Sequence, residues 1–178
     1  MNTFFRRIRG AMALNPYVYE EVEADRAANL QAIAVVLLAA AAAGVGVRGL
    51  GASDSAMPTV LLLALLTWPA WAMLTLQIGT KLLPTGKTRS DVGELLRTLG
   101  FAAAPGILRV VAVVPALSRL VFAVTTVWML CAMVVAVRQA LDYTSTVRAF
   151  LVCLIGLVLT LIMVFVIGSF TATVLLSP

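Results

Sequence analysis

The sequence contains no histidine and only two cysteines. Histidine is the commonest general base and the commonest metal ligand, so the residue that usually performs either role is absent. Cys131 and Cys153 lie in apolar segments without a CxxC pair, and we interpret them as small buried residues rather than metal ligands or a disulfide. Paired carboxylates and a nucleophile beside a base are also missing. We therefore expect a protein that is not an enzyme and needs no cofactor or metal ion.

Charged residues are scarce, at 12% of the chain, whereas 62% of its 178 residues are hydrophobic. The mean hydropathy is +1.04. A helix of about 20 apolar residues crosses the hydrocarbon core of a bilayer. Five segments are long enough, at about 27–47, 59–82, a proline-broken stretch ending near 117, 120–141 and 150–176. The pattern predicts an all-α polytopic membrane protein, with a five-transmembrane-helix bundle at 27–178 preceded by cytoplasmic N-terminal helices at 1–26.

The N-terminal residues have the pattern of an amphipathic helix. Apolar side chains recur every three or four residues, at Met1, Phe4, Phe5, Ile8, Ala11 and Met12, whereas Arg6, Arg7 and Arg9 face the other way. Such a helix lies in the membrane interface, where anionic headgroups attract the arginines. We expect Phe4, Phe5 and Ile8 to contact the membrane or a partner. Asn15 and Pro16 predict the cap and first residue of a second helix.

Acidic residues follow in this second helix, at Glu20, Glu21, Glu23 and Asp25. Two interpretations stay open. The cluster is a solvated face, or it is a docking surface for a basic patch, either the arginines next to it or those of a partner.

The segment Asp91–Gly106, DVGELLRTLGFAAAPG, leads from a polar loop back into the membrane. Its first half is amphipathic, with leucines on one side and Asp91, Glu94 and Arg97 on the other, as in an interfacial helix. Its second half is apolar and must kink at Pro105, because proline has no N–H to donate and its ring clashes with the preceding turn.

Arg109 follows three residues after Gly106, within apolar sequence. A charge inside the bilayer costs at least about 2.5 kcal/mol and marks a polar cavity or a partner. Alternatively, the guanidinium bonds carbonyls that Pro105 leaves free, or it extends to the interface. The candidate structural or binding residues are Arg109, Pro105, Gly106, Glu94 and Arg97.

Small and aromatic residues in the first two spans predict close helix packing. Ala40-xxx-Gly44 and Ala42-xxx-Gly46 allow a neighbouring helix to approach the first span. Trp68 and Trp71 lie too far inside the second span for an interfacial position, so we expect them to pack between helices.

The basic residues predict the orientation. A cytoplasmic N-terminus leaves only Arg48 and Arg119 in external loops. It places inside Arg6, Arg7, Arg9, Arg26, Lys81, Lys87, Arg89, Arg97, Arg138 and Arg148. We therefore expect a protein of the inner (cytoplasmic) membrane with an external C-terminus.

Two segments resemble the bacterial branch of the Yip family of small multipass membrane proteins: Gly93–Gly106, GELLRTLGFAAAPG, and Trp128–Tyr143, with WML and VAVRQALDY. The acidic helix after Asn15-Pro16 adds to the likeness. The resemblance implies five spans. Eukaryotic members of this family work in vesicle traffic and bind Rab GTPases through cytoplasmic N-terminal regions. Their Asp-Leu-Tyr-Gly-Pro motif is absent here, and the N-terminal region is short.

We expect the chain to act by association, as a scaffold, accessory subunit or membrane-organising factor. Its partners are membrane lipid and other membrane proteins or further copies of itself, not nucleic acid. The alternative is a small permease or a lipid- or anion-handling protein that uses Arg109.

Overall fold

The computed structural model describes residues 2–52, 56–85 and 90–176, with side chains described up to residue 162 except that of residue 56. Every regular element in these ranges is helical. The predicted basic residues Lys87 and Arg89 lie outside the described residues.

Among the described residues, four helical segments are long and apolar enough to cross a membrane, so this is a membrane-embedded protein. They are α3 (Ala28–Gly46) with its 3-10 extension η1 (Val47–Leu50), α4 (Ala56–Gln77) with the π-helical turn η2 (Ile78–Leu82), α5 (Val92–Ala102) with the 3-10 helix η3 (Ala104–Val113), and α6 (Ser118–Ala140). A last helix, α7 (Thr146–Leu176), follows, and its stretch Thr146–Ile162 is also apolar.

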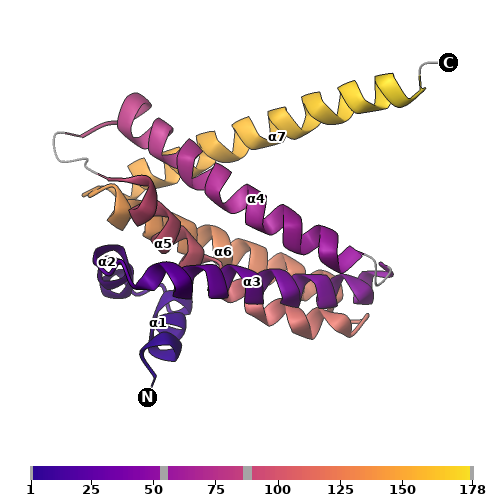
Figure 1. Cartoon of the computed structure of the whole chain (residues 1–178), viewed down its shortest axis with the longest axis horizontal. Coiled ribbons are helices and arrows are strands. Elements are labelled where there is room, and N and C mark those ends of the chain that lie inside the picture. The colour runs from indigo at the N-terminus through magenta and orange to yellow at the C-terminus, as the bar shows by residue number, and fades with distance from the viewer. Residues whose placement is uncertain (1, 53–55, 86–89, 177–178) are drawn as a thin grey trace.

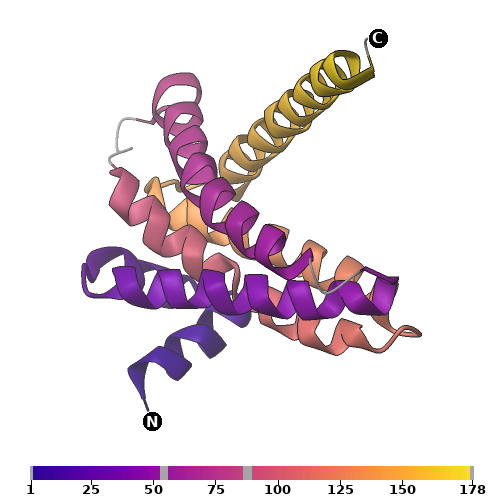
Figure 2. The same ribbon diagram turned by 45° about the vertical axis from the view of Figure 1, so that its right-hand side comes forward.

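Two short helices precede the spans. α1 (Thr3–Met12) is capped by the side chain of Asn2, and α2 (Pro16–Ala24) is capped by Asn15 with Pro16 in its first turn, as the sequence predicts. Leu14 between them has a φ of 57°, which turns the chain sharply. In Figures 1 and 2, α1 runs across α3 rather than along it. This is the orientation that a helix in the membrane interface requires.

Small residues let α3 pack closely against η3. A Cβ atom on Gly46 would lie 2.3 Å from the carbonyl oxygen of Arg109, so a side chain there would collide with backbone. At Gly106, an added Cβ would lie 3.1 Å from both the Cβ of Ala39 and the Sδ of Met129. The predicted close approach to the first span is confirmed, and Gly106 lies between α3 and α6.

The predicted break at Pro105 is also confirmed. The α-helix ends at Ala102, and the chain continues as a 3-10 helix from Ala104. The N–H groups of Ala103 and Gly106 donate to the carbonyls of Gly100 and Ala103, at 3.2 and 2.9 Å. In the more tightly wound 3-10 helix, backbone N–H groups of the same segment therefore donate hydrogen bonds to the carbonyls next to the proline.

The interpretation of residues 91–99 as an interfacial helix is wrong. In α5, Leu95, Thr98, Leu99 and Phe101 are at most 3% exposed, because the helix packs among α2, α3, α4 and α6. On its polar side, Arg97 is buried against other parts of the protein, whereas Glu94 is half-buried and Asp91 is exposed.

Aromatic side chains join distant segments at the membrane-spanning helices. The indole N–H of Trp68 donates to the carbonyl of Leu96 at 3.2 Å, and that of Trp128 donates to the carbonyl of Met12 at 2.8 Å. Trp71 lies against Gly156 of α7. The prediction that Trp68 and Trp71 pack between helices is confirmed.

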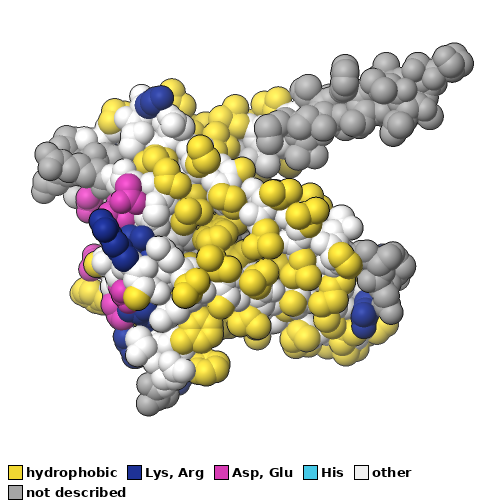
Figure 3. All heavy atoms as spheres, viewed as in Figure 1, with side chains coloured by type: hydrophobic (Ala, Val, Ile, Leu, Met, Phe, Trp, Pro, Cys, Tyr) yellow, Lys and Arg dark blue, Asp and Glu magenta, His cyan; other side chains and the backbone are white. Residues whose placement is uncertain are grey.

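α4 and α7 meet near the end of α4 and diverge from there, so that the far half of α7 points away from the bundle (Figures 1 and 2). Figure 3 shows that charged side chains gather mainly over the end formed by α1 and α2, whereas hydrophobic side chains cover the long helices. An apolar belt with a charged end is the surface expected of a protein embedded in lipid.

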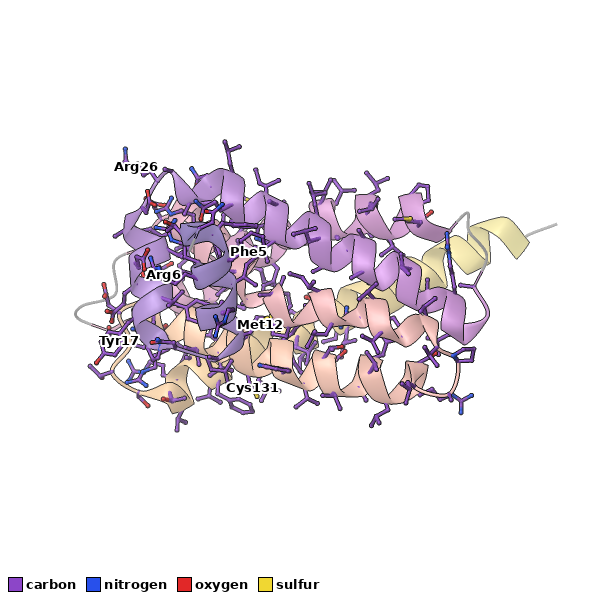
Figure 4. All side chains as sticks on the ribbon, turned by 90° about the horizontal axis from the view of Figure 1, so that it is seen from below. Phe5, Arg6, Met12, Tyr17, Arg26 and Cys131 are labelled. Carbon is purple, nitrogen blue, oxygen red and sulfur yellow. The ribbon has the colours of Figure 1, made fainter. Side chains whose placement is uncertain are left out.

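The two cysteines differ in their exposure. Cys153 is buried, as predicted, whereas Cys131 is exposed on the surface of α6 (Figure 4). Both thiols are free.

Candidate functional site

The predicted site residues fall into two separate groups. The N-terminal cap consists of α1 and α2 together with the groups that hold them to the bundle, and it includes Arg97 and Glu94. The second group surrounds Arg109 on η3. The structure does not bring Glu94 or Arg97 together with Arg109.

Arg7 is the centre of the N-terminal cap and is only 5% exposed. Its Nε donates to Oε1 of Glu21 at 2.9 Å, its Nη2 to Oδ2 of Asp25 at 2.7 Å, and its Nη1 to Oε1 of Gln31 at 3.0 Å. Arg6 donates from Nη1 to Oε2 of Glu21 at 2.7 Å. Of the two interpretations of the acidic cluster, docking onto the neighbouring arginines is confirmed for Glu21 and Asp25.

The electrostatics explain this pairing. Glu21 and Asp25 lie at the carboxyl end of α2, where the helix dipole disfavours negative charge, and the arginines compensate for it. The hydrogen bond from Arg6 lowers the pKa of Glu21, and that from Arg7 lowers the pKa of Asp25. The expectation that Arg7 faces anionic headgroups is therefore wrong, because Arg7 is buried against carboxylates of its own chain. Arg6 pairs with Glu21 but is exposed, so for Arg6 the expectation stays a prediction.

The residues that the sequence places at the membrane interface also differ in how far they are buried. Ile8 is buried in the core and Phe4 packs against that core, so neither needs a membrane or a partner. Phe5 is 59% exposed and Arg9 is exposed. Figure 4 shows Phe5 and Met12 on α1, apart from Tyr17 on α2. Of the predicted residues, Phe5, Arg6 and Arg9 are exposed to contacts outside the chain.

Arg97 is 5% exposed and connects α5 to the end of α2. Its guanidinium donates to the backbone carbonyls of Val22 and Glu23 and to Oδ1 of Asn29. The last carbonyls of a helix have no partner within the helix, and a cation there is doubly favourable because it also meets the negative end of the dipole. Arg97 thus closes the carboxyl end of α2, which the amphipathic pattern of α5 did not reveal.

Glu94 begins α5. It forms a capping box with Asp91: the N–H of Glu94 donates to Oδ1 of Asp91 at 2.8 Å, and Oε2 of Glu94 accepts from the N–H of Asp91 at 2.9 Å. Glu94 also lines a cavity of about 790 Å³ with Glu20, Glu23 and Asp142. Burial, and then the neighbouring charges of Glu94 and Asp142, raise the pKa of Glu23 to about 7.

Arg109 is held by residues of α6. Its Nε donates to Oγ1 of Thr125 at 3.2 Å and its Nη2 to Oγ1 of Thr126 at 2.9 Å. Its Cζ lies 5.3 Å from the centroid of the Phe122 ring, which is cation–π distance. The hypothesis that Arg109 bonds carbonyls freed at Pro105 is not observed, because 3-10 bonds occupy carbonyls there.

Arg109 also lines an apolar pocket of about 660 Å³ between the long helices. Ala40 and Ala43 of α3, Trp68 and Trp71 of α4, and Met129 and Met133 of α6 contribute to its wall. Pro105 and Gly106 are buried at the start of η3. Sequence reasoning missed Phe122, Thr125 and Thr126, since a threonine pair in a span usually bonds its own preceding turn.

No protein-family model, curated protein or solved structure matches this chain. In the described ranges, no group of three or more His, Cys, Asp or Glu side chains could hold a metal ion.

The ionic contacts predict that Arg7 holds the N-terminal cap to the bundle. Arg7→Gln removes the cation that the carboxylates of Glu21 and Asp25 share, so Asp25 loses its arginine partner and Glu21 keeps only Arg6. We expect protease to cleave within residues 1–26 much faster in detergent or membranes. Arg9→Gln on the same helix is the matched control and should stay protected. Equal protection of both variants would show that Arg7 is not needed.

The raised pKa of Glu23 predicts a stability that depends on pH. Folding raises the pKa of Glu23 from 4.5 to about 7, so the folded state favours the neutral acid. This contribution to the free energy of unfolding is fully present below pH 4.5 and is lost as the pH rises to about 7.

Thermal unfolding in detergent should therefore occur at a lower temperature at pH 8 than at pH 5. Glu23→Gln should remove most of this difference, whereas Glu20→Gln, one turn away, should keep it. Hydrogen bonds from Arg6 and Arg7 lower the pKa values of Glu21 and Asp25. These two carboxylates therefore stay ionised between pH 5 and pH 8 and do not contribute to the difference. A wild-type midpoint that is constant from pH 5 to 8 would contradict the assignment.

Proposed function

We propose that this chain is a non-enzymatic membrane protein of the bacterial Yip-like type, which acts as a scaffold, accessory subunit or membrane-organising factor by associating with other membrane proteins. The observation that carries this proposal is the N-terminal cap, which is fixed to the bundle yet leaves large apolar side chains exposed. Tyr17 of α2 is 78% exposed, and Phe5 of α1 is 59% exposed.

A cap of this kind favours binding for a physical reason. Ordering loops and side chains opposes association, and a surface that is already ordered by Arg7 and Arg97 avoids most of that loss. Aromatic residues such as Tyr17 and Phe5 are enriched where proteins bind each other. Most of the polar groups in the cap, in contrast, are occupied by partners in the same chain.

The proposed topology has five spans in the inner membrane, with α7 as the fifth, a cytoplasmic cap and an external C-terminus. It is supported by the scarcity of basic residues at the end opposite the cap, where the predicted external loops carry Arg48 and Arg119. A reporter fused after residue 178 should be active only if it is external, and one inserted at residues 86–89 only if it is cytoplasmic. Two reporters on the same side would mean that α7 does not cross.

A site-specific crosslink tests association. A photoreactive amino acid in place of Tyr17 should give one discrete protein adduct in native membranes, because an ordered docking surface selects its partner. The matched control is Leu62, a 58% exposed residue on α4, which should give lipid adducts only. Mass spectrometry of the adduct separates a second copy of this chain from another protein. Identical adducts at both positions, or none at Tyr17, would overturn the proposal.

A further inference from the structure

We propose that the pocket beside Arg109 is a binding site for an anionic phospholipid, whose phosphate bonds the guanidinium while one acyl chain fills the pocket. This inference requires a membrane-embedded chain but does not depend on association with a protein partner.

The first support is the chemistry of the pocket wall. Alanine, valine, leucine, methionine and tryptophan side chains form most of it, and Arg109 is the one charged residue among the described residues that line it. Ligand pockets are mainly apolar, with a few polar groups that fix the orientation of the ligand. An apolar chain with a single anionic group has the composition that matches this wall.

The second support is the charge of Arg109. Within the described residues, no carboxylate forms an ion pair with its guanidinium. The guanidinium has five N–H groups, and the threonine bonds use one at Nε and one at Nη2, so three remain. A planar set of free donors suits a phosphate, which accepts two parallel hydrogen bonds. The anion would supply the charge that the protein lacks at this position.

The third support is the way in which α6 positions the guanidinium without neutralising it. Oγ1 of Thr125 donates to the carbonyl of Val121 at 2.7 Å, so its oxygen is fixed where it accepts from Nε of Arg109. Thr126 and the ring of Phe122 hold the guanidinium from other sides. An arginine that is oriented by neutral groups keeps its full charge for a ligand.

The position along the bundle also fits a lipid. Arg109 is four residues before the end of η3, which corresponds to about 8 Å at the rise of a 3-10 helix. It therefore lies towards one face of the membrane, where headgroup phosphates are within reach of a long side chain. Along α4, the pocket extends from Val60 to Gln77, about 25 Å, which exceeds the half-thickness of about 15 Å that one acyl chain occupies.

The size of the pocket favours a lipid chain over a helix from a partner. A transmembrane helix about 10 Å wide and 30 Å long occupies on the order of 2,000 Å³. The pocket measures about 660 Å³, which lies within the usual range for small ligands. A partner helix could cover the opening but could not enter.

A photoactivatable phosphatidylglycerol tests this site, with the full-length protein reconstituted into phosphatidylcholine vesicles that contain a small fraction of the probe. The label should map to peptides of α3, α4 and α6 that line the pocket. Arg109→Gln should reduce this labelling about tenfold or more, because it removes the charge-assisted hydrogen bonds to the phosphate. Arg109→Lys should retain part of it. Arg119→Gln, an exposed arginine in the first turn of α6, is the control and should label normally.

A second variant tests the pocket without changing Arg109. Ala64 lines the pocket, and Ala64→Leu places added volume inside it while remaining apolar. Labelling of the pocket should fall, whereas the thermal midpoint in detergent should stay close to that of the wild type. This variant keeps the test decisive even if Arg109→Gln destabilises the fold.

Three outcomes would overturn the proposal. The first is equal labelling of the wild type and both pocket variants. The second is a label that maps to lipid-facing residues of α4 rather than to the pocket. The third is displacement of the probe by millimolar inorganic phosphate, which would identify a site for a free anion instead of a lipid. Loss of the Tyr17 crosslink with intact lipid labelling would affect only the association function.

Discussion

The hydrogen bonds from Arg97 to the carbonyls of Val22 and Glu23 are the interaction on which the polar end of the molecule depends. They join residues 75 and 74 positions apart in the chain. Because they satisfy carbonyls at the carboxyl end of α2, the helix can end against the bundle without unpaired backbone groups. With α2 fixed there, Glu21 and Asp25 meet the arginines of α1, and Glu23 lies in the cavity that Glu94 and Asp142 share. The buried guanidinium of Arg97 thus fixes the end of α2, and Arg7 joins α1 to it.

Arg7 and Arg97 show why sequence patterns predicted the helices better than the surroundings of individual side chains. The caps at Asn15, the break before Pro105 and the long apolar helices follow from local chemistry, and the structure has all of them. Whether an arginine on the polar side of a helix faces water, a carboxylate or a carbonyl depends on what packs against it. Arg7 and Arg97 are buried because polar groups of α2 replace water around them. Periodicity marks a side as polar but does not identify the partner.

The candidate site on η3 was predictable only in part for the same reason. An arginine in apolar sequence after a proline break is a visible signal, and Arg109 does line a pocket. Its partners Thr125 and Thr126 come from α6, where nothing in the local sequence distinguishes them from threonines that bond their own helix. The pocket itself arises because α3, α4 and α6 use alanine, methionine and widely spaced tryptophan side chains at facing positions. Because these three segments are far apart in the chain, no local sequence motif indicates the pocket.

The cap and the pocket share α3, and the packing of that helix decides whether they influence each other. Gln31 near its start binds Arg7, whereas Ala40 and Ala43 further along line the pocket. Between these points, α3 is held by contacts that leave little room: a Cβ on Gly100 would lie 2.8 Å from that of Ala32. Densely packed contacts of this kind shift between discrete arrangements rather than by gradual sliding. A second connection runs through α6, because Trp128 bonds the carbonyl of Met12 in the cap and Met129, the next residue, lines the pocket. Binding at the cap can therefore reach the pocket only through a change in the packing of α3, α5 or α6.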